Sequence, residues 1–251
     1  MRISFSSCPR SWIAAVALIL VARAAFADCQ SRAFDGARYE VCAFDTRRDD
    51  LRLYLHDASR RPYADFSTLA QALKSQGRVL RFAMNAGMFE EDLSPVGLFI
   101  ENGRRLHRAD LREGDTNFHL KPNGVFWIGD HAAGVVETSR FLANPPPARF
   151  ATQSGPLLVI DGRIHPKILP TGVSEKIRNG VCVRDGADVI FAISDEPVTF
   201  HAFARLFRDA LGCANALFFD GSVSSLYAPE LGRDDELVPL GPMVGVSAPA
   251  P

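Results

Sequence analysis

The residues around Asp220 have the types and the spacing of a reactive site. The apolar run at 216–219 predicts a buried strand whose tip presents Asp220, and Gly221 follows. Three serines come within the next five residues: Ser222, Ser224 and Ser225. An aspartate at a strand tip is usually a turn former, but hydroxyls and backbone amides gathered in this way favour a cradle for an anion. The segment therefore indicates a polar site at a strand end.

Two cations, Lys176 and Arg178, precede Asn179 and are separated by one residue. In an extended chain, side chains two residues apart point to the same face. The planar guanidinium of arginine also matches the geometry of phosphate. Two solvated cations are the alternative for such a segment on its own. The pair supplies a candidate phosphate contact, with Asn179 beside it.

Asn85 marks another polar strand end. It closes the predicted strand at 79–85, and Gly87, which follows, leaves room for a ligand to approach the backbone. Phe89 comes two residues later. An asparagine-capped turn explains this segment equally well, so Asn85 is a candidate only in combination with the other segments.

Ser154 and Gly155 suggest a serine nucleophile, but the full G-x-S-x-G elbow is absent because Thr152 and Pro156 stand at its glycine positions. A hydrogen-bonding loop at 152–156 is therefore predicted. In a separate segment, His119 and Lys121 share a face if the chain is extended. A lone histidine there is more often structural, and Lys121 is a second candidate cation for a phosphate.

Short strands and tight turns dominate the elements that must hold these groups. Branched and aromatic residues predict strands at 38–45, 50–56, 79–85, 96–101, 104–107, 125–128, 134–137, 157–160, 181–184, 189–194 and 216–219. Asn102-Gly103 and Asp185-Gly186 each separate two such runs, which is a strong hairpin signal. The sequence thus predicts many antiparallel strand pairs.

Two helices are predicted from apolar residues at helical spacing. The first follows Ser67, its candidate N-cap, and stops at Gly77; the second follows Thr199 and stops at Gly212. No regular strand–helix alternation appears. We therefore predict an α+β fold, a single domain over 28–251 with a largely antiparallel or mixed sheet, many hairpins and a few flanking helices.

Two stretches lack strand or helix signals of their own. The proline-rich stretch 144–147 has predicted strands at similar density on both sides, so we interpret it as a surface loop and not a domain linker. The end of the chain is predicted to be frayed beyond Val246.

The first 27 residues have the pattern of a secretory signal peptide: Arg2 and Arg10, an apolar run at 12–22, and small residues at Ala25 and Ala27. The run is short for a membrane span. Cleavage after Ala27 leaves 224 of the 251 residues, with 25 of the 28 basic residues against 29 acidic ones. We expect a periplasmic or secreted protein with no membrane span and no nucleic-acid partner.

Four cysteines remain after cleavage, which favours disulfides in an oxidising compartment. Cys29 and Cys42 flank a turn-like stretch at 34–37, and a hairpin there would join them. Cys182 and Cys213 lie in apolar segments, so they form either a second disulfide or two buried thiols. No pair has the close spacing of a structural zinc site.

Taken in order, four motifs resemble the phosphodiester glycosidase family. They are Asn85-Ala86-Gly87 with Phe89, Gln153-Ser154-Gly155-Pro156, Arg178-Asn179-Gly180, and Asp220-Gly221 with Ser224-Ser225. The resemblance covers about 84–226, and the front end resembles a bacterial branch linked to exopolysaccharides. It implies that Asn85, Gly87, Arg178, Asp220 and Ser224 line one site. The family's turn reads Asp-Gly-Gly-Gly-Ser, whereas this chain has Asp220-Gly221-Ser222-Val223-Ser224. Val223 narrows what the turn can do, and this departure bears on the substrate more than on the reaction.

The resemblance implies hydrolysis of a glycosidic bond between a sugar and a phosphodiester-linked partner, in a small molecule or a cell-envelope glycan. Phosphate leaves as a stable anion, so the main demand is to hold its charge while the sugar becomes cationic. Arg178, helped by Lys176 or Lys121, would hold the charge of the phosphate. Asp220 would stabilise the cationic sugar, as nucleophile, base or electrostatic stabiliser. No cofactor is predicted, and a divalent metal stays open. The alternatives are a metal-dependent phosphodiesterase and a non-catalytic carbohydrate-binding protein.

Overall fold

The computed structural model describes residues 1, 28–235 and 238–251. The predicted signal peptide lies outside these residues, apart from Met1. Asp28 and Cys29 are tied to distant parts of the described chain. The carbonyl of Asp28 accepts a hydrogen bond from the Ala43 N–H at 2.8 Å, and the backbone N–H of Cys29 donates to Glu230 at 2.7 Å. Cleavage after Ala27 stays a prediction.

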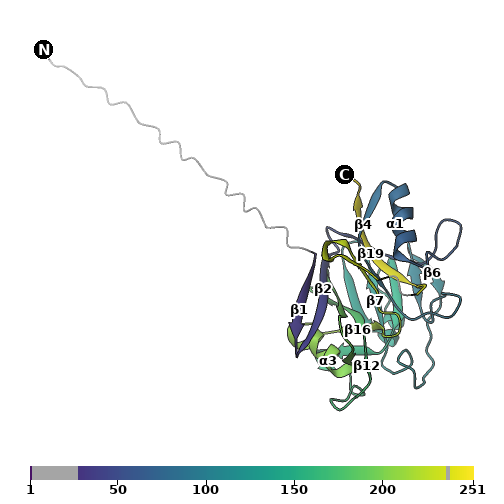
Figure 1. Cartoon of the computed structure of the whole chain (residues 1–251), viewed down its shortest axis with the longest axis vertical. Coiled ribbons are helices and arrows are strands. Elements are labelled where there is room, and N and C mark those ends of the chain that lie inside the picture. Colours follow the sequence, from purple (N-terminus) through teal and green to yellow (C-terminus); the bar gives the residue numbers. More distant parts are fainter. Residues whose placement is uncertain (2–27, 236–237) are drawn as a thin grey trace.

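Three antiparallel sheets and a two-stranded ribbon form the described chain (Figure 1). The first sheet runs in the order β1 (Cys29–Phe34), β2 (Ala37–Asp45), β14 (Asp188–Ser194), β13 (Asn179–Arg184), β16 (Ala216–Asp220), β10 (Leu157–Ile160) and β11 (Arg163–Ile164). The second runs β18 (Arg233–Asp234), β17 (Leu226–Ala228), β4 (Arg78–Asn85), β19 (Met243–Pro249) and β3 (Asp50–Tyr54). The third runs β6 (Arg104–His107), β5 (Phe99–Glu101), β9 (Phe150–Ser154), β7 (Gly124–Ile128) and β8 (Ala133–Glu137).

The ribbon pairs β12 (Glu175–Lys176) with β15 (Val198–Thr199). The helices are α1 (Phe66–Ser75), α2 (Thr138–Ala143), α3 (Phe200–Arg205) continued by a π-helical turn (Leu206–Ala210), and a short 3-10 turn (Pro229–Leu231). The prediction of a largely antiparallel sheet protein with few helices is confirmed. The third sheet contains strands from before and after 144–147, so that stretch connects strands of one sheet.

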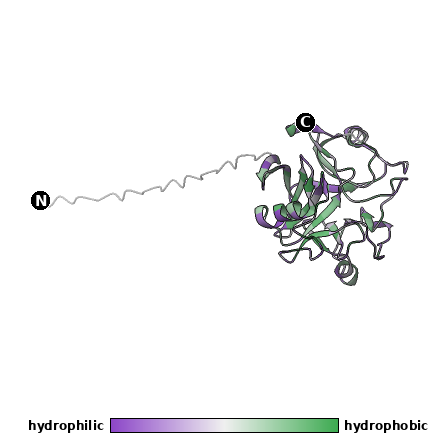
Figure 2. Cartoon of the chain, turned by 60° about the horizontal axis from the view of Figure 1, so that its bottom comes forward, coloured by the Kyte–Doolittle hydropathy of each residue, from purple (hydrophilic) through white to green (hydrophobic). Residues whose placement is uncertain are grey.

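Five phenylalanines hold the three sheets together. Neighbouring rings have centroids 4.9 to 6.1 Å apart in the pairs Phe44–Phe82, Phe82–Phe191, Phe126–Phe191 and Phe126–Phe219. Figure 2 shows the hydrophobic residues concentrated along the central strands. Helix α3 and its π-helical turn cover the other face of the first sheet with Phe203 and Phe207. The first sheet is therefore packed on both faces, by the cluster between the sheets on one side and by the cluster under α3 on the other.

Local signals predicted the turns and one helix start well. Both central residues of the Asp185-Gly186 turn have positive φ, 49° and 70°, and so do those of Asn102-Gly103, at 51° and 75°. That is the conformation for which Asn-Gly and Asp-Gly are preferred. The Thr199 hydroxyl accepts the Ala202 N–H, which confirms it as the N-cap of α3.

Three local predictions are wrong. The N-cap of α1 is Asp65, whose carboxylate accepts the Thr68 N–H, and not Ser67. The segment 152–156 is no loop, because residues up to Ser154 form β9 between β5 and β7. The end of the chain is not frayed after Val246, because β19 continues to Pro249 and pairs with β4 on one side and β3 on the other. In the last two cases, partners distant in sequence supply the hydrogen bonds.

Both cysteine pairs form disulfides. Cys29 lies directly opposite Cys42 in the β1–β2 register, and the predicted bridge joins them. Cys182 and Cys213 form the second bridge, in the core under α3. The alternative of two buried thiols at these positions is therefore wrong.

The second bridge should contribute more to stability than the first. It spans a sequence separation of 31 residues against 13, and loop entropy favours the longer closure by about 0.8 kcal/mol, within a typical range of about 2–5 kcal/mol for a bridge. Cys182→Ala with Cys213→Ala should therefore lower the free energy of unfolding more than Cys29→Ala with Cys42→Ala. Urea denaturation of both double variants measures the difference. Free thiols in non-reducing peptide maps of the wild type would contradict the pairing itself.

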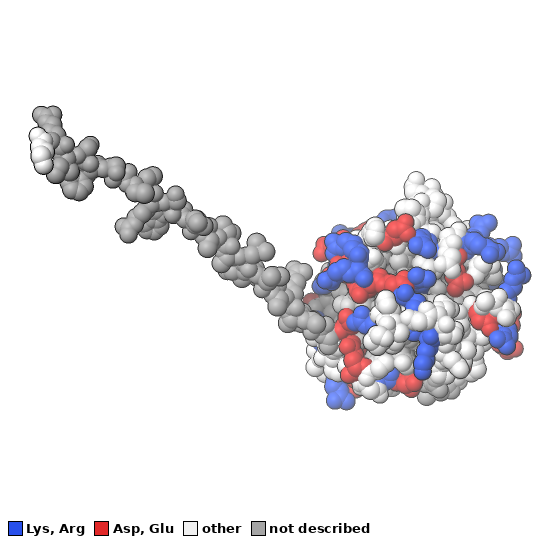
Figure 3. All heavy atoms as spheres, turned by 90° about the horizontal axis from the view of Figure 1, so that it is seen from above, with Lys and Arg blue, Asp and Glu red and all other residues white. Residues whose placement is uncertain are grey.

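The described helices include none that is long and apolar enough to cross a membrane. Basic and acidic side chains are interspersed over the face drawn in Figure 3. The absence of a nucleic-acid partner stays a prediction.

Candidate active site

Four strand ends from two sheets meet at one point. Asn85 is the last residue of β4, Asn179 the first of β13 and Asp220 the last of β16, while Ser225 directly precedes β17. Asn179 stands opposite Asp220 in the strand register, and an irregularity follows between Asn179 and Gly180. These strand ends carry three of the four motifs that the sequence singled out. The fourth reaches them through the Ser154 hydroxyl, which donates to the carbonyl of Phe219, the neighbour of Asp220.

Asn179 is the centre of a buried hydrogen-bond network. Its amide nitrogen donates to the backbone oxygen and side-chain Oδ1 of Asn85 at 3.0 and 2.8 Å. Its Oδ1 accepts the Asp220 N–H at 3.1 Å and the Ser224 hydroxyl at 3.3 Å. Asn85 Oδ1 also accepts the Ser225 N–H at 2.9 Å. Because these residues are almost wholly buried, the network fixes the position of Asp220.

The Asp220 carboxylate is held by its own turn. Its Oδ1 accepts the N–H groups of Ser222 and Val223. The hydroxyls of Ser224 and Ser225 reach backbone carbonyls, those of Asp220 and Val223, at 2.9 and 2.8 Å. Two backbone amides of the turn therefore bind the carboxylate of Asp220 itself, whereas the two hydroxyls donate to carbonyls. A cradle for the anion of a ligand stays a prediction. Burial raises the pKa of Asp220, and the backbone N–H bonds oppose that shift.

Arg178 is buried at the same place, with 1% of its surface exposed. Its Nε donates to the Val198 carbonyl at 2.8 Å and its Nη2 to the Ser174 carbonyl at 2.7 Å. The guanidinium carbon lies 3.6 Å from the centre of the Phe200 ring. Its Nη1 has no hydrogen-bond partner within the described part of the chain. Burial lowers the pKa of Arg178 to about 10, so it stays charged at neutral pH.

Gly221 separates Nη1 from a cavity. A Cβ at Gly221 would lie 3.1 Å from the Phe218 ring, which is a tight contact, and 3.5 Å from both Arg178 Nη1 and Lys176 Cβ, which is an ordinary van der Waals distance. Gly221 and Lys176 also line a cavity of about 600 Å³. Lys176 therefore faces the cavity directly, whereas Nη1 of Arg178 is buried behind Gly221. Protein carbonyls occupy Nε and Nη2 of Arg178, so its guanidinium cannot present both of these groups to a phosphate as the match in geometry suggested.

The departures from the family's glycine-rich turn do not disturb its backbone. Neither Ser222 nor Val223 has a positive φ, so neither position requires glycine. Val223 packs at the edge of the cluster under α1, and Ser222 lines the cavity. Ser222 is thus the departure that changes the surface a ligand meets.

Ser154 and Gly87 pack between the sheets near the strand ends. Ser154 is fully buried and donates its hydroxyl to the Phe219 carbonyl at 2.9 Å. Gly87, with φ 136°, is in close contact with β9, where a Cβ would lie 3.0 Å from the Thr152 hydroxyl. Gly155 packs closely against Asn123, and Phe89 against Gly241.

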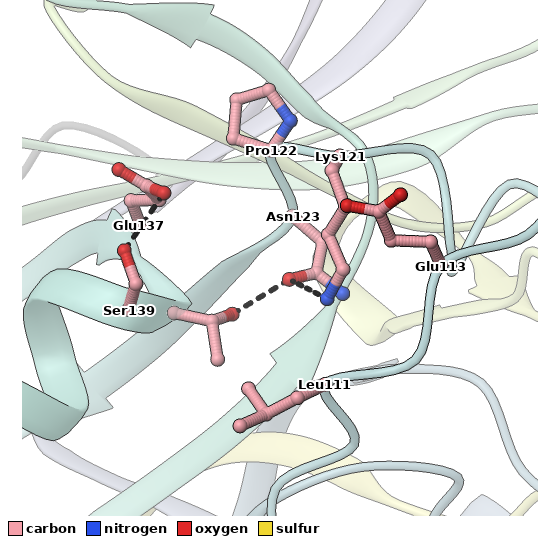
Figure 4. A pocket seen from close by; sticks show the side chains of 8 residues that line it. Leu111, Glu113, Lys121, Pro122, Asn123, Glu137 and Ser139 are labelled. Carbon is pink, nitrogen blue, oxygen red and sulfur yellow. Dashed lines mark hydrogen bonds between the residues drawn. The ribbon is translucent and has the colours of Figure 1, made fainter.

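His119 and Lys121 lie elsewhere. His119 contacts Asp110 at 3.2 Å and Thr116 at 2.7 Å. Figure 4 shows Lys121 in a separate pocket of about 430 Å³, where Nζ donates to Asn123 at 3.3 Å. Burial lowers the pKa of Lys121. Neither residue lines the cavity beside Gly221. The prediction that Lys121 helps Arg178 is therefore wrong. The segment before Lys121 is bound to the third sheet, because the side chain of Gln153 makes two hydrogen bonds with the backbone of Asp110.

Three residues that the sequence did not suggest line the cavity beside Gly221: Asp195, Arg233 and Asp235. Arg233 donates to Asp195 at 2.8 Å and to Asp235 at 2.6 Å. Asp195 directly follows β14, as a polar residue at the end of an apolar strand, and this signal was available in the sequence. Arg233 and Asp235 follow the short 3-10 turn and had no comparable signal. Over the described residues, no group of three metal-ligating side chains is found.

Solved structures share this architecture. The catalytic domain of zebrafish N-acetylglucosamine-1-phosphodiester alpha-N-acetylglucosaminidase, auto-inhibited by its pro-peptide, superposes with a TM-score of 0.60 at 13% identity, over 87% of this chain and 81% of that one. A hypothetical protein from Synechocystis superposes with a TM-score of 0.53 at 15% identity, over 88% of this chain and 61% of that one. At these identities the likeness shows the fold.

The sequence comparisons go further. The protein YigE of Escherichia coli (strain K12), itself uncharacterised, is 34% identical over 177 residues, which cover 70% of this chain and 69% of YigE. The family model for phosphodiester glycosidase matches residues 79–240, a range that contains all four strand ends of the site. The chain belongs to the phosphodiester glycosidase family.

Proposed function

We propose that this protein is a hydrolase that cleaves the glycosidic bond between a sugar and a phosphate-linked partner. The observation that carries the proposal is the buried Arg178, whose Nη1 has no partner and lies at Gly221, next to the Asp220 turn. A buried charged donor left unpaired is unfavourable unless a ligand completes it. Phosphate is the anion that best suits this donor and Lys176 together.

The roles of these residues follow from the charges of the phosphate and of the sugar. Arg178 and Lys176 would hold the phosphate as it leaves, and fixed charges of this kind are often the largest catalytic contribution. Asp220 would meet the positive charge that develops on the sugar, as nucleophile, base or electrostatic stabiliser. The zebrafish relative acts on an N-acetylglucosamine-1-phosphodiester, so N-acetylglucosamine 1-phosphodiesters are the first substrates to test.

We also propose that the protein works outside the cytoplasm, in the periplasm or secreted, on a small molecule or a cell-envelope glycan. Two disulfides support this location, since such bonds persist in oxidising compartments. The signal pattern in the first 27 residues agrees with it.

Hydrolysis in ¹⁸O-labelled water tests the reaction. If water attacks the anomeric carbon, the C–O bond breaks, the sugar acquires the label and the phosphate monoester leaves with its own oxygen. Mass spectrometry of the two products should therefore find ¹⁸O in the sugar. Label in the phosphate would instead show P–O cleavage by a phosphodiesterase. Binding of sugar phosphates without any turnover would show a carbohydrate-binding protein.

A further inference from the structure

Two groups of charged residues line the cavity beside Gly221. The first contains Glu175 and Lys176. Arg178 is not among the lining residues, and its unpaired Nη1 is buried beside Gly221, one of the residues of the cavity wall. The second contains Asp195, Arg233 and Asp235. A volume of about 600 Å³ lies in the range of small-molecule sites and is sufficient for a monosaccharide with its phosphate. Under the function proposed above, the phosphate lies at the first group, which leaves the second group for another part of the substrate.

Arg233 is not available to a second phosphate. Its Nη1 donates to Asp195 Oδ1 at 2.8 Å, and its Nη2 and Nε donate to the two oxygens of Asp235 at 2.6 and 3.4 Å. Asp235 in turn accepts the Leu226 N–H at 3.0 Å. These side chains are only about a quarter exposed, at 21–23%. Arg233 therefore positions Asp195, and Asp235 anchors Arg233 to β17.

Asp195 keeps one oxygen for a ligand. Its Oδ2 has a single ion-pair contact, at 3.9 Å, with the Nε of the largely exposed Arg38. An ionised carboxylate only accepts hydrogen bonds, and it repels a phosphate. Its natural complement in this cavity is a neutral group with several hydroxyl donors. A sugar ring has that chemistry.

We propose that Asp195 accepts the hydroxyls of the sugar, so that the cavity holds its substrate in one direction, with the phosphate at Arg178 and Lys176 and the sugar ring at Asp195. This inference rests on the function proposed above and adds the residue that binds the sugar. Arg233 is a positioning residue that acts through Asp195. Ser194, which precedes Asp195, accepts the Arg178 N–H through its hydroxyl at 3.0 Å, so one strand end connects both halves of the site.

Calorimetric titration tests the phosphate end and the sugar end of the cavity independently. The probes are inorganic phosphate and the 1-phosphates of glucose, galactose and N-acetylglucosamine, and the tightest of the three sugar phosphates is used for the variants. Asp195→Asn should weaken that sugar phosphate about tenfold, the effect of losing a hydrogen bond to a charged group. The affinity for inorganic phosphate should stay within about twofold, which also shows that the variant is folded.

Matched variants sharpen the result. Asp188→Asn removes an ion-paired carboxylate at the other end of β14 and should change neither affinity. Arg233→Gln should weaken the sugar phosphate and spare inorganic phosphate, because Asp195 then loses its support. Equal losses for both probes in Asp195→Asn, or no loss for the sugar phosphate, would overturn the assignment.

The same titrations distinguish this inference from the proposed function. If Arg178→Lys abolishes phosphate binding while Asp195→Asn leaves the sugar phosphate unaffected, only the orientation is wrong. If Arg178→Lys leaves phosphate binding unchanged, or if the wild type binds neither phosphate nor any sugar 1-phosphate, both proposals are overturned.

Discussion

Asp220→Asn is expected to lower turnover of a sugar 1-phosphodiester by about 100- to 1,000-fold, the range seen when one preorganised electrostatic group is removed. Asparagine retains the Oδ1 acceptor that binds the N–H groups of Ser222 and Val223. The Asp220 N–H bond to Asn179 is a backbone contact and is unaffected. The substitution therefore removes the negative charge and the proton site without removing the packing.

The stability of this variant should move in the opposite direction to its activity. Burial raises the pKa of Asp220 above its ordinary value of 3.8, so the folded state holds the proton more tightly than the unfolded chain does. Ionised Asp220 therefore destabilises the fold at neutral pH, and this effect disappears below pH 3.8, where both states are protonated. Asp220→Asn should melt at the same or a higher temperature than the wild type at pH 7, with the difference vanishing in acid.

Asp161→Asn is the matched control. Asp161 also follows an apolar strand and precedes a glycine, but it lies at the exposed hairpin turn after β10. Its substitution should leave turnover unchanged. If ionised Asp220 is required, the acidic limb of kcat/KM should lie above pH 3.8 in the wild type. A folded Asp220→Asn protein with near wild-type turnover would remove Asp220 from the mechanism.

Short-range chemistry explains which parts of the fold were predictable. Asn102-Gly103 and Asp185-Gly186 adopt the left-handed conformation for which their residues are suited, so the turn identifies the hairpin without knowledge of its surroundings. The strand at 243–249 is different. It follows glycine and proline, and its hydrogen bonds come from β4 and β3, whose residues lie more than 150 positions earlier. No local pattern contains that information.

The residues of the site also fall into those that a local signal identifies and those that depend on distant parts of the chain. Polar residues at the ends of apolar strands identified Asn85, Asn179 and Asp220, because a strand end is a local signal. The contact of Arg178 with the carbonyls of Val198 and Ser174 depends on the ribbon of β12 and β15, so its geometry was mispredicted. The ion pairs of Arg233 join segments that are 38 residues apart. Lys121 was a candidate partner of Arg178 as a second cation, whereas it lies in a separate pocket.

Arg178→Lys is expected to reduce kcat/KM for an anionic phosphodiester by about 100-fold, within the range for losing a charged donor in the transition state. The side chain of lysine ends in a single ammonium nitrogen and lacks the planar guanidinium group of arginine. It cannot donate to Val198 and Ser174, stack on Phe200 and still present a donor at Gly221. Arg178→Ala should show the same loss, with a higher KM and a lower kcat. Arg184→Lys, at the exposed other end of β13, should change neither.

The decisive comparison is between charged and neutral substrates. If Nη1 binds phosphate, the loss in Arg178→Lys should fall below about threefold for a neutral aryl glycoside. Inorganic phosphate should likewise inhibit the wild type competitively and fail to inhibit the variant. Where aryl glycosides are not cleaved, the inhibition constants alone make this comparison. Equal losses with charged and neutral ligands would mean that Arg178 only supports the fold, through its two carbonyl contacts and the ring of Phe200.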